Sequence, residues 1–262
     1  MEVSKKVIYI KDWILDYVNS MPTKASSLVI GISGGIDSSV SSTLSALTGL
    51  KTIAISMPIK QKTIQHDLSL KHQEWLKKNF KNVSGFTIEL DDLFNSFEKT
   101  LSKFNNEHGM ANSRARLRMS TLYQVAAANN GIVVGTGNKV EDFGVGFYTK
   151  YGDGGVDISP IADLFKSEVY MLAKYLNIIK SIQKADPTDG LWPDSRTDED
   201  QIGVSYEELE WAMKINQKNN DINSFSERQK LVLNVYKEFN TKNHHKMIPI
   251  PVCKIPLNLL KK

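Results

Sequence analysis

The stretch from Leu28 to Gly49, LVIGISGGIDSSVSSTLSALTG, constrains the fold more than any other part of the chain. It opens with a short apolar run rich in β-branched residues, which is typical of a buried parallel strand. The adjacent Gly34 and Gly35 carry no Cβ atoms, so the backbone can turn sharply there and approach a ligand closely. Apolar residues then recur at helical spacing, and we expect a helix that begins near Asp37. The stretch therefore predicts a strand, a glycine turn and a helix in direct succession.

The polar residues of this turn predict an anion-binding site. A helix N-terminus presents free N–H groups, and the hydroxyls of Ser33, Ser38 and Ser39 lie beside them in the sequence. The alternative is an ordinary strand–turn–helix corner that binds nothing. The order Ser-Gly-Gly-x-Asp-Ser-Ser between a strand and a helix favours the ligand site. The turn is not a Walker A loop, because no Gly-Lys-Ser or Gly-Lys-Thr follows the glycines, and it does not match G-x-G-x-x-G.

Strand and helix patterns alternate along the chain. Further strands are expected at 52–58, 83–90 and 131–138. Helical spacing occurs at 64–80, 93–104 and 111–130. This alternation predicts an α/β fold with a doubly wound parallel sheet, in which ligands bind at the carboxyl ends of the strands. Two of the predicted strand ends carry polar, glycine-rich loops, which strengthens the prediction of a site at that edge.

We expect residues 1–262 to form a single domain. Its predicted parts are an N-terminal helix at 1–20, an α/β core at about 25–185, a lid-like loop at 186–203 and a helical C-terminal region at 204–262. The loop is long and rich in Asp and Glu, so it is either functional or a flexible surface segment.

Composition and charge narrow the class of protein. The 262 residues can bury one large core, and 41% apolar and 24% charged residues are ordinary for a globular protein. No apolar run approaches the ~18 residues of a membrane span, and the first residues do not resemble a signal peptide. We therefore expect no membrane partner and a cytoplasmic setting. The formal net charge of +4 is too small to favour a nucleic-acid partner.

Cysteine and histidine usage argues against a transition-metal site. Cys253 is the single cysteine, which excludes an intramolecular disulfide and a Cys-rich metal site. The adjacent His244 and His245 lack the spacing of zinc ligands.

The glycine turn resembles the SGGxDS loop of the PP-loop ATP pyrophosphatase family. In that family the loop holds the β,γ-pyrophosphate of ATP as a leaving group. The resemblance therefore implies attack on the α-phosphate, release of pyrophosphate, and an adenine-nucleotide hydrolase-like fold.

Longer motifs resemble the ammonia-dependent NAD synthetase family. They are ANSRARLRM at 111–119, GTGNKVEDFGVGFYTKYGDGGVDISPIADLFKSEV at 135–169, PTDGLWPDSRTDEDQIGVSYEEL at 187–209 and HHK at 244–246. The resemblance extends from Gly31 to Lys246 and implies ATP-driven amidation of deamido-NAD with ammonia, which yields NAD, AMP and pyrophosphate. A free carboxylate is a poor electrophile and must be adenylated first, and Mg²⁺ offsets the charge of the phosphates as they separate.

The same resemblance implies a set of site residues. The residues implied to contact ATP are Gly31, Ile32, Ser33, Gly34, Gly35, Ile36, Asp37, Ser38, Thr136, Lys166 and Thr188. The residues implied to contact deamido-NAD are Arg116, Lys150, Asp157, His245 and Lys246. Asp37 and Glu141 are the implied Mg²⁺ ligands, because this ion prefers hard oxygen donors. Together with Lys166 they form the implied catalytic group.

Several of these residues also have plainer interpretations. Asp37 suits a helix cap, while Glu141 and Lys166 suit solvated positions. Arg114 and Arg118 fall outside the resemblance and are interpreted as solvated. The segment equivalent to 186–203 closes over the site in the family, although its composition alone suits a flexible surface loop equally well.

Two other functions stay open. One is another amidating or tRNA-modifying PP-loop enzyme, which a panel of acceptors assayed for AMP release distinguishes. The other is a non-catalytic adenine-nucleotide-binding protein, which would bind ATP without releasing pyrophosphate.

Two further expectations concern assembly and the nitrogen donor. The resemblance implies a homodimer, and Trp13 and Tyr17 beside the aliphatic stripe of the first predicted helix suit either an interface or the core. Because 262 residues leave no room for an amidase domain, we expect ammonia rather than glutamine to supply nitrogen.

Overall fold

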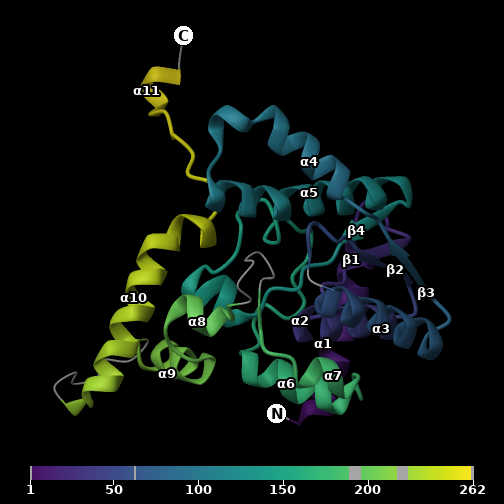
Figure 1. Ribbon diagram of the computed structural model, residues 1–262, viewed down its shortest axis with the longest axis horizontal. Coiled ribbons are helices and arrows are strands. Elements are labelled where there is room, and N and C mark those ends of the chain that lie inside the picture. The colour runs from purple at the N-terminus through teal and green to yellow at the C-terminus, as the bar shows by residue number, and fades with distance from the viewer. Residues whose placement is uncertain (1, 62, 189–195, 217–223, 261–262) are drawn as a thin grey trace.

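The computed structural model describes residues 2–61, 63–188, 196–216 and 224–260 (Figure 1). Within this part of the chain a four-stranded parallel sheet lies at the centre, in the order β3-β2-β1-β4. Its strands are β1 (Ser27–Gly31), β2 (Lys51–Ser56), β3 (Val83–Thr87) and β4 (Gly131–Val133). The predicted parallel α/β sheet is confirmed.

Helices flank this sheet on both faces. The first half of the chain contains α1 (Val3–Ser20), α2 (Ile36–Leu47), α3 (Thr63–Asn79), α4 (Asp91–Thr100), the 3₁₀ turn η1 (Ser102–Phe104) and α5 (Glu107–Ala128). The second half contains the π-helix η2 (Val140–Val145), α6 (Lys166–Tyr175), α7 (Lys180–Gln183), α8 (Asp198–Ile202), α9 (Tyr206–Asn216), α10 (Glu227–Met247) and α11 (Leu257–Leu260).

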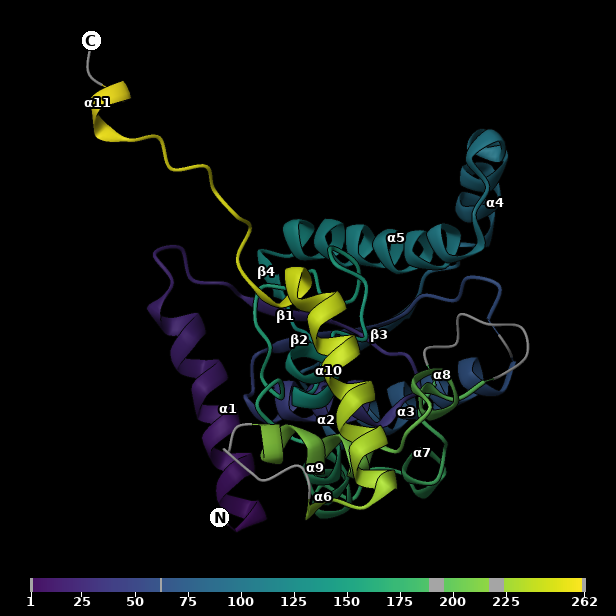
Figure 2. The same cartoon turned by 90° about the vertical axis from the view of Figure 1, so that its left-hand side faces the viewer.

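Side chains of β1 alternate between two apolar cores. Leu28 and Ile30 belong to the core that includes α1, α2 and α6, whereas Val29 belongs to the core that includes α4 and α5. Figure 2 shows α5 on one side of the strands and α2, α3 and α6 on the other. This two-sided cover is the doubly wound arrangement, and it explains why the strands are apolar on both faces.

The observed boundaries differ from the predicted ones where side chains or loops intervene. The strand predicted at 131–138 has only three residues, because the chain then turns and the Gly135 N–H donates to the Ile158 carbonyl at 2.7 Å. Helix α5 begins at Glu107 rather than at 111, because the Asn106 side chain caps it by accepting from the Gly109 N–H at 2.8 Å.

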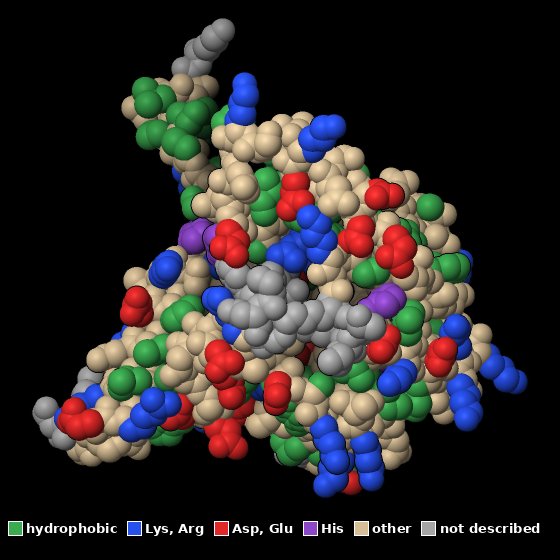
Figure 3. Space-filling view, in the orientation of Figure 1, with side chains coloured by type: hydrophobic (Ala, Val, Ile, Leu, Met, Phe, Trp, Pro, Cys, Tyr) green, Lys and Arg blue, Asp and Glu red, His purple; other side chains and the backbone are tan. Residues whose placement is uncertain are grey.

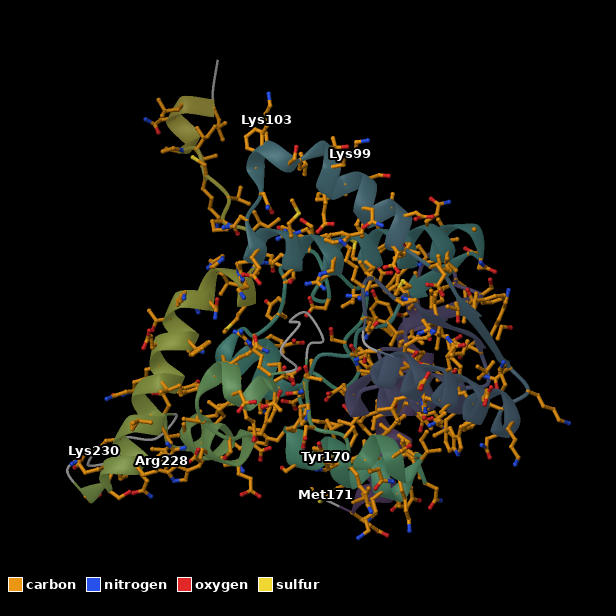
Figure 4. The ribbon with its side chains drawn as sticks, viewed as in Figure 1. Lys99, Lys103, Tyr170, Met171, Arg228 and Lys230 are labelled. Carbon is orange, nitrogen blue, oxygen red and sulfur yellow. The ribbon has the colours of Figure 1, made fainter. Side chains whose placement is uncertain are left out.

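A third apolar core joins η2 to the C-terminal helices. Its members include Val145 of η2, Leu209 of α9 and Val232 of α10. At the outer end of these helices Arg228, which Figure 4 labels, pairs with Glu208 at 2.6 Å. The loop predicted at 186–203 is partly helical, because it contains α8, and its residues 189–195 lie outside the described part of the chain.

The chain after α10 leaves the body of the molecule and ends in α11 (Figures 1 and 2). Its large aliphatic side chains are mostly exposed, and Figure 3 shows hydrophobic side chains gathered at that end. The most exposed of them are Val252 and Leu257, at 76% each. Among the described residues, no helix combines the length and the hydropathy needed to span a bilayer.

Candidate active site

The glycine turn between β1 and α2 is held together by its own serine hydroxyls. Gly34 adopts φ +89°, a conformation that favours glycine. The Gly35 N–H donates to Ser33 Oγ at 3.1 Å, and Ser33 Oγ lies 3.0 Å from Ser38 Oγ. Ser39 is fully buried, and its hydroxyl donates to the Gly35 carbonyl at 2.9 Å. Ser38, which is 3% exposed, also donates to the Gly35 carbonyl, at 3.1 Å, so Ser38 and Ser39 stabilise the turn, while Ser33 is exposed on it.

The other residues predicted in this loop lie where the strand passes into the helix. Gly31 ends β1 close to Met57, with 3.3 Å between Met57 Cε and the position of an added Cβ. Ile32 and Ile36 are buried in the core on either side of the turn. These apolar anchors fix the backbone of the loop at both ends.

Lys166 lies between Asp37 and Glu141. Its Nζ is 2.7 Å from Asp37 Oδ2 and 2.9 Å from Glu141 Oε1, and Lys166 is only 3% exposed. The three residues come from three elements, namely the first turn of α2, η2 and the first residue of α6. The interpretations of Asp37 as a helix cap and of Lys166 as a solvated lysine are wrong, because Gly35 occupies the cap position and Lys166 is buried.

Burial and charge act in opposite directions on this group. Burial opposes the charged form of Lys166, but Asp37 and Glu141 outweigh it and hold the pKa of Lys166 above its ordinary value. Burial raises the pKa of Asp37 despite Lys166. For Glu141, burial is outweighed by Lys166 and Tyr206, so its pKa lies below the ordinary value. A further cation beside Asp37 and Glu141 would favour the ionised form of both carboxylates.

Three residues that the sequence analysis did not assign complete this group. The Asn138 side-chain amide donates to Asp37 Oδ1 at 3.1 Å. The Oδ1 atom of Asn138 accepts from the Val140 N–H at 3.0 Å. The Tyr206 hydroxyl donates to Glu141 Oε1 at 2.6 Å and lies 3.2 Å from Asp198 Oδ2.

The sequence motifs contained these three residues but did not single them out. Asn138 ends the GTGN motif, and Asp198 and Tyr206 belong to the TDEDQIGVSY motif. Both motifs carried the resemblance, yet neither indicated which of its polar side chains turns inward.

The π-helix η2 carries Glu141. Such wide turns are rare and are frequent at functional sites. Gly146 ends η2 at φ +63°. Next to Glu141, burial and the neighbouring carboxylates raise the pKa of Asp142 to about 8, and the same causes raise the pKa of Asp153. The surroundings of Glu141 therefore carry a surplus of acidic groups.

Three of the predicted deamido-NAD contacts meet at the end of α10. Lys150 Nζ donates to the His245 carbonyl at 2.7 Å. Lys246 Nζ donates to the carbonyls of Gly146 at 2.6 Å and Tyr148 at 2.8 Å. We call these contacts of Lys150, His245 and Lys246 the α10 clasp. The clasp joins α10 to the segment that follows η2.

The remaining predicted contacts are spread apart. Both carboxylate oxygens of Asp157 bond to the protein: one accepts from the Val133 N–H at 2.7 Å and the other from the Tyr123 hydroxyl at 3.0 Å. Arg116 is exposed on α5. Thr136 is half-buried just beyond β4, and the Thr188 hydroxyl donates to the Arg196 carbonyl at 3.2 Å.

The interpretation of Arg118 as a solvated residue is wrong. Arg118 Nε donates to the Met57 carbonyl at 2.9 Å, beyond the end of β2. Burial, with the neighbouring Arg114, lowers the pKa of Arg118 to about 10. Because residues four apart share a helix face, Arg114 and Arg118 point the same way, and Arg114 lies over the Phe94 ring at 5.8 Å.

The sequence of this chain is similar to those of known NAD synthetases. The family model described as NAD synthase matches residues 6–249. The NH(3)-dependent NAD(+) synthetase of Mycoplasma genitalium is 37% identical over 230 residues, which cover 86% of this chain and 87% of that protein.

Two solved structures are similar over nearly the whole chain. An NMN synthetase from Francisella tularensis has a TM-score of 0.83 at 32% identity, covering 98% of this chain and 99% of the other. An NH3-dependent NAD synthetase from Campylobacter jejuni has a TM-score of 0.78 at 27% identity, covering 97% and 100%. The match of the family model over most of the chain, together with these relatives, places the protein in the NAD synthase family.

Proposed function

We propose that this chain amidates deamido-NAD with ammonia, consuming ATP and releasing NAD, AMP and pyrophosphate. The observation that carries the proposal is the position of Lys166 between Asp37 and Glu141 beside the glycine turn. A buried cation beside a glycine turn and a helix N-terminus suits a reaction in which negative charge moves onto a leaving pyrophosphate. Membership of the NAD synthase family supports deamido-NAD as the acceptor.

The chain's own residues would act mainly by positioning and by charge. The glycine turn from Gly31 to Ser38, with the N-terminus of α2, would bind the phosphates of ATP. Lys166 would stabilise the charge that develops as pyrophosphate leaves. Thr136 and Thr188 complete the proposed ATP contacts. The acceptor carboxylate would attack the α-phosphate, and ammonia would then displace AMP from the acyl adenylate.

The residues present fit a magnesium ion. Asp37 and Glu141 offer hard oxygen donors on either side of Lys166 Nζ. Among the described residues no group of three or more His, Cys, Asp or Glu side chains is placed to hold a metal. Asp37 and Glu141 would therefore share the ion with phosphate and water, which is how Mg²⁺ usually binds. Its chemistry there would be to offset charge on the separating phosphates.

For the acceptor, we propose that Arg116, Lys150, Asp157, His245 and Lys246 form the binding region. The α10 clasp supports this, because it gathers Lys150, His245 and Lys246 within one small region. The amino groups of both lysines donate to backbone carbonyls in the clasp, so they would orient the end of α10 as well as contact the nucleotide. Asp157, tied to β4 and Tyr123, would act from a fixed position.

A mononucleotide acceptor is the second candidate. The observation that favours it is the similarity to the Francisella tularensis NMN synthetase over 98% of this chain. The reaction would be the same, with nicotinate mononucleotide in place of deamido-NAD. The ratio of kcat/KM for the two acceptors separates these candidates.

We further propose a cytoplasmic homodimer without a nucleic-acid or membrane partner. The exposed apolar side chains after α10 support the dimer, because exposed patches of this kind commonly mark an interface. On the face seen in Figure 3, acidic and basic side chains are interspersed, and an interspersed pattern does not suit a nucleic-acid backbone. Both ATP and Mg²⁺ are supplied in the cytoplasm.

The decisive experiment is an assay of the pure chain with ATP, Mg²⁺, ammonium and a panel of acceptors. We expect AMP and amidated product with deamido-NAD or nicotinate mononucleotide, and no product with glutamine as the only nitrogen source. ATP binding without AMP release for every acceptor would contradict the proposal and favour a non-catalytic binding protein. AMP release with an unrelated acceptor would favour another PP-loop enzyme.

A further inference from the structure

The Tyr206 hydroxyl lies between two carboxylates but has only one proton to give. It lies 2.6 Å from Glu141 Oε1 and 3.2 Å from Asp198 Oδ2, and Tyr206 is 6% exposed. A phenol donates one hydrogen bond at a time. The shorter distance assigns that bond to Glu141 in the present structure. Asp198 is the alternative acceptor, and rotation of the hydroxyl about its C–O bond is enough to reach it.

Glu141 Oε1 is heavily used in this arrangement. It accepts from both Lys166 Nζ, at 2.9 Å, and the Tyr206 hydroxyl. Each carboxylate oxygen has about two lone pairs for such bonds. A cation that binds Oε1 must therefore displace one of the two donors. A cation that binds the other oxygen draws charge from the whole carboxylate and weakens Oε1 as an acceptor.

Of the two donors to Glu141 Oε1, the Tyr206 hydroxyl is the one that can turn away without moving the rest of its side chain. Lys166 is tied to Asp37 as well, and its ammonium lies 4.6 Å from the centre of the Tyr206 ring. The ring is packed in the apolar core of the C-terminal helices and stays in place while the hydroxyl turns. Asp198, itself 6% exposed, is the first residue of α8. A stronger bond to Asp198 would therefore fasten the start of α8.

We propose that Tyr206 is a positioning residue for the cation site, whose hydroxyl turns from Glu141 to Asp198 when Glu141 binds a cation. This inference rests on the proposed role of Glu141 as a metal ligand. In the absence of the cation, Tyr206 holds Glu141 beside Lys166. With the cation bound, Tyr206 releases Glu141 and stabilises α8. Because such coupling is reciprocal, an ordered α8 also favours cation binding at Glu141.

The test measures α8 without relying on turnover. The probes are Mg²⁺ together with α,β-methylene-ATP, and the analogue alone with a chelator. The readout is hydrogen exchange of the Gln201 and Gly203 amides, which donate to the carbonyls of Thr197 and Glu199 at 3.1 and 2.7 Å. In the unmodified chain we expect Mg²⁺ to slow this exchange by roughly threefold or more relative to the analogue alone.

Two tyrosine variants give a matched comparison. Tyr206→Phe removes only the hydroxyl and should abolish the Mg²⁺-dependent slowing at α8. Tyr236→Phe removes the hydroxyl of an equally buried tyrosine of the same apolar core, also 6% exposed, and should retain it. Should Tyr206→Phe fail to fold, Asp198→Asn weakens the second acceptor and should also reduce the slowing. Thermal unfolding of each variant establishes that it is folded.

Retention of the full Mg²⁺ effect in Tyr206→Phe, or its absence from the unmodified chain, would overturn the inference. Both outcomes are distinguishable from failure of the proposed function, because AMP formation from ATP and the acceptor is measured separately on the same preparations. An active chain without the α8 effect contradicts only the role of Tyr206.

Discussion

Lys166 Nζ lies 2.7 Å from Asp37 Oδ2, although 129 residues separate the two in the chain. The contact joins the first turn of α2 to the first residue of α6. It brings a buried ammonium to the carboxyl edge of the sheet, beside the glycine turn. Most of the expected behaviour of the site depends on this pair and on Glu141, which lies 2.9 Å from the same nitrogen.

Replacing Lys166 by Met should remove most of the activity. The variant leaves Asp37 and Glu141 without their buried cation, so we expect a fall in kcat of about 10²–10³-fold. The free energy of unfolding, measured by denaturant titration without metal, should fall by about 3–5 kcal/mol. Lys174→Met, at an exposed position on the same helix, is the control and should change neither quantity. A Lys166→Met enzyme with unchanged kcat would contradict the assigned role.

Asp37→Asn and Glu141→Gln should depress adenylation even at saturating ATP and acceptor. The loss should fall mainly on kcat, because the charge of a bound cation matters most as pyrophosphate leaves. Steady-state rates over a range of Mg²⁺ concentrations check this, with circular dichroism to confirm folding. Near-normal rates of Asp37→Asn at limiting Mg²⁺ would overturn the metal assignment.

Arg116→Ala and Lys150→Ala should weaken binding of the acceptor and largely spare that of ATP. Losing a charge-assisted contact costs about 1.5–3 kcal/mol, or roughly tenfold to a hundredfold in KM. Lys150→Ala also removes the hydrogen bond to the His245 carbonyl and should lower the melting temperature. Arg116→Ala should leave the melting temperature unchanged, because Arg116 is exposed. An Arg116→Ala effect confined to the KM for ATP is the outcome that contradicts this assignment.

His72 should make stability fall in mild acid. Burial lowers its pKa to about 4, from an ordinary value of 6.5. Because the native side chain resists protonation, the unfolded state binds more protons between these values, and stability present above pH 6.5 is lost as the pH falls toward 4. The slope contributed by one such group is at most about 1.4 kcal/mol per pH unit.

His72→Gln removes this titration. The free energy of unfolding of the unmodified protein and of the variant is measured with denaturant across the same pH range. It should fall less steeply with acidification in the variant. Equal pH profiles would show that His72 does not carry the effect. Its contact with Ser42 Oγ, at 2.9 Å, makes a general loss of stability expected in the variant at every pH.

Removal of residues 249–262 should convert the proposed dimer to a monomer. This segment carries Ile250, Val252 and Leu257, which are exposed in the single chain and would be covered by a second copy. Light scattering at micromolar concentration gives the molar mass of the intact and of the truncated protein. A full-length chain that is monomeric and fully active would refute the dimer, and a truncated chain that stays dimeric would place the interface elsewhere.

Local patterns in the sequence were enough to predict the parallel sheet and the glycine turn. A β-branched run, two glycines and helical spacing lie within 22 consecutive residues, from Leu28 to Gly49. Strand, turn and helix preferences are set by neighbouring residues, so these elements were predicted close to their observed bounds. The family resemblance then singled out Asp37, Glu141 and Lys166, which the fold brings together.

The partners of those residues were decided only by tertiary structure. Lys166 had the sequence of a solvated helix start, and its burial depends on carboxylates that arrive from α2 and η2. Asn138 and Tyr206 belong to segments that meet only after the sheet and the C-terminal helices pack. Hydrogen bonds between such distant residues depend on the relative placement of whole elements, which no local pattern encodes. The sequence by itself determined the strand–turn–helix scaffold, whereas packing determined which polar side chains turn inward to meet on it.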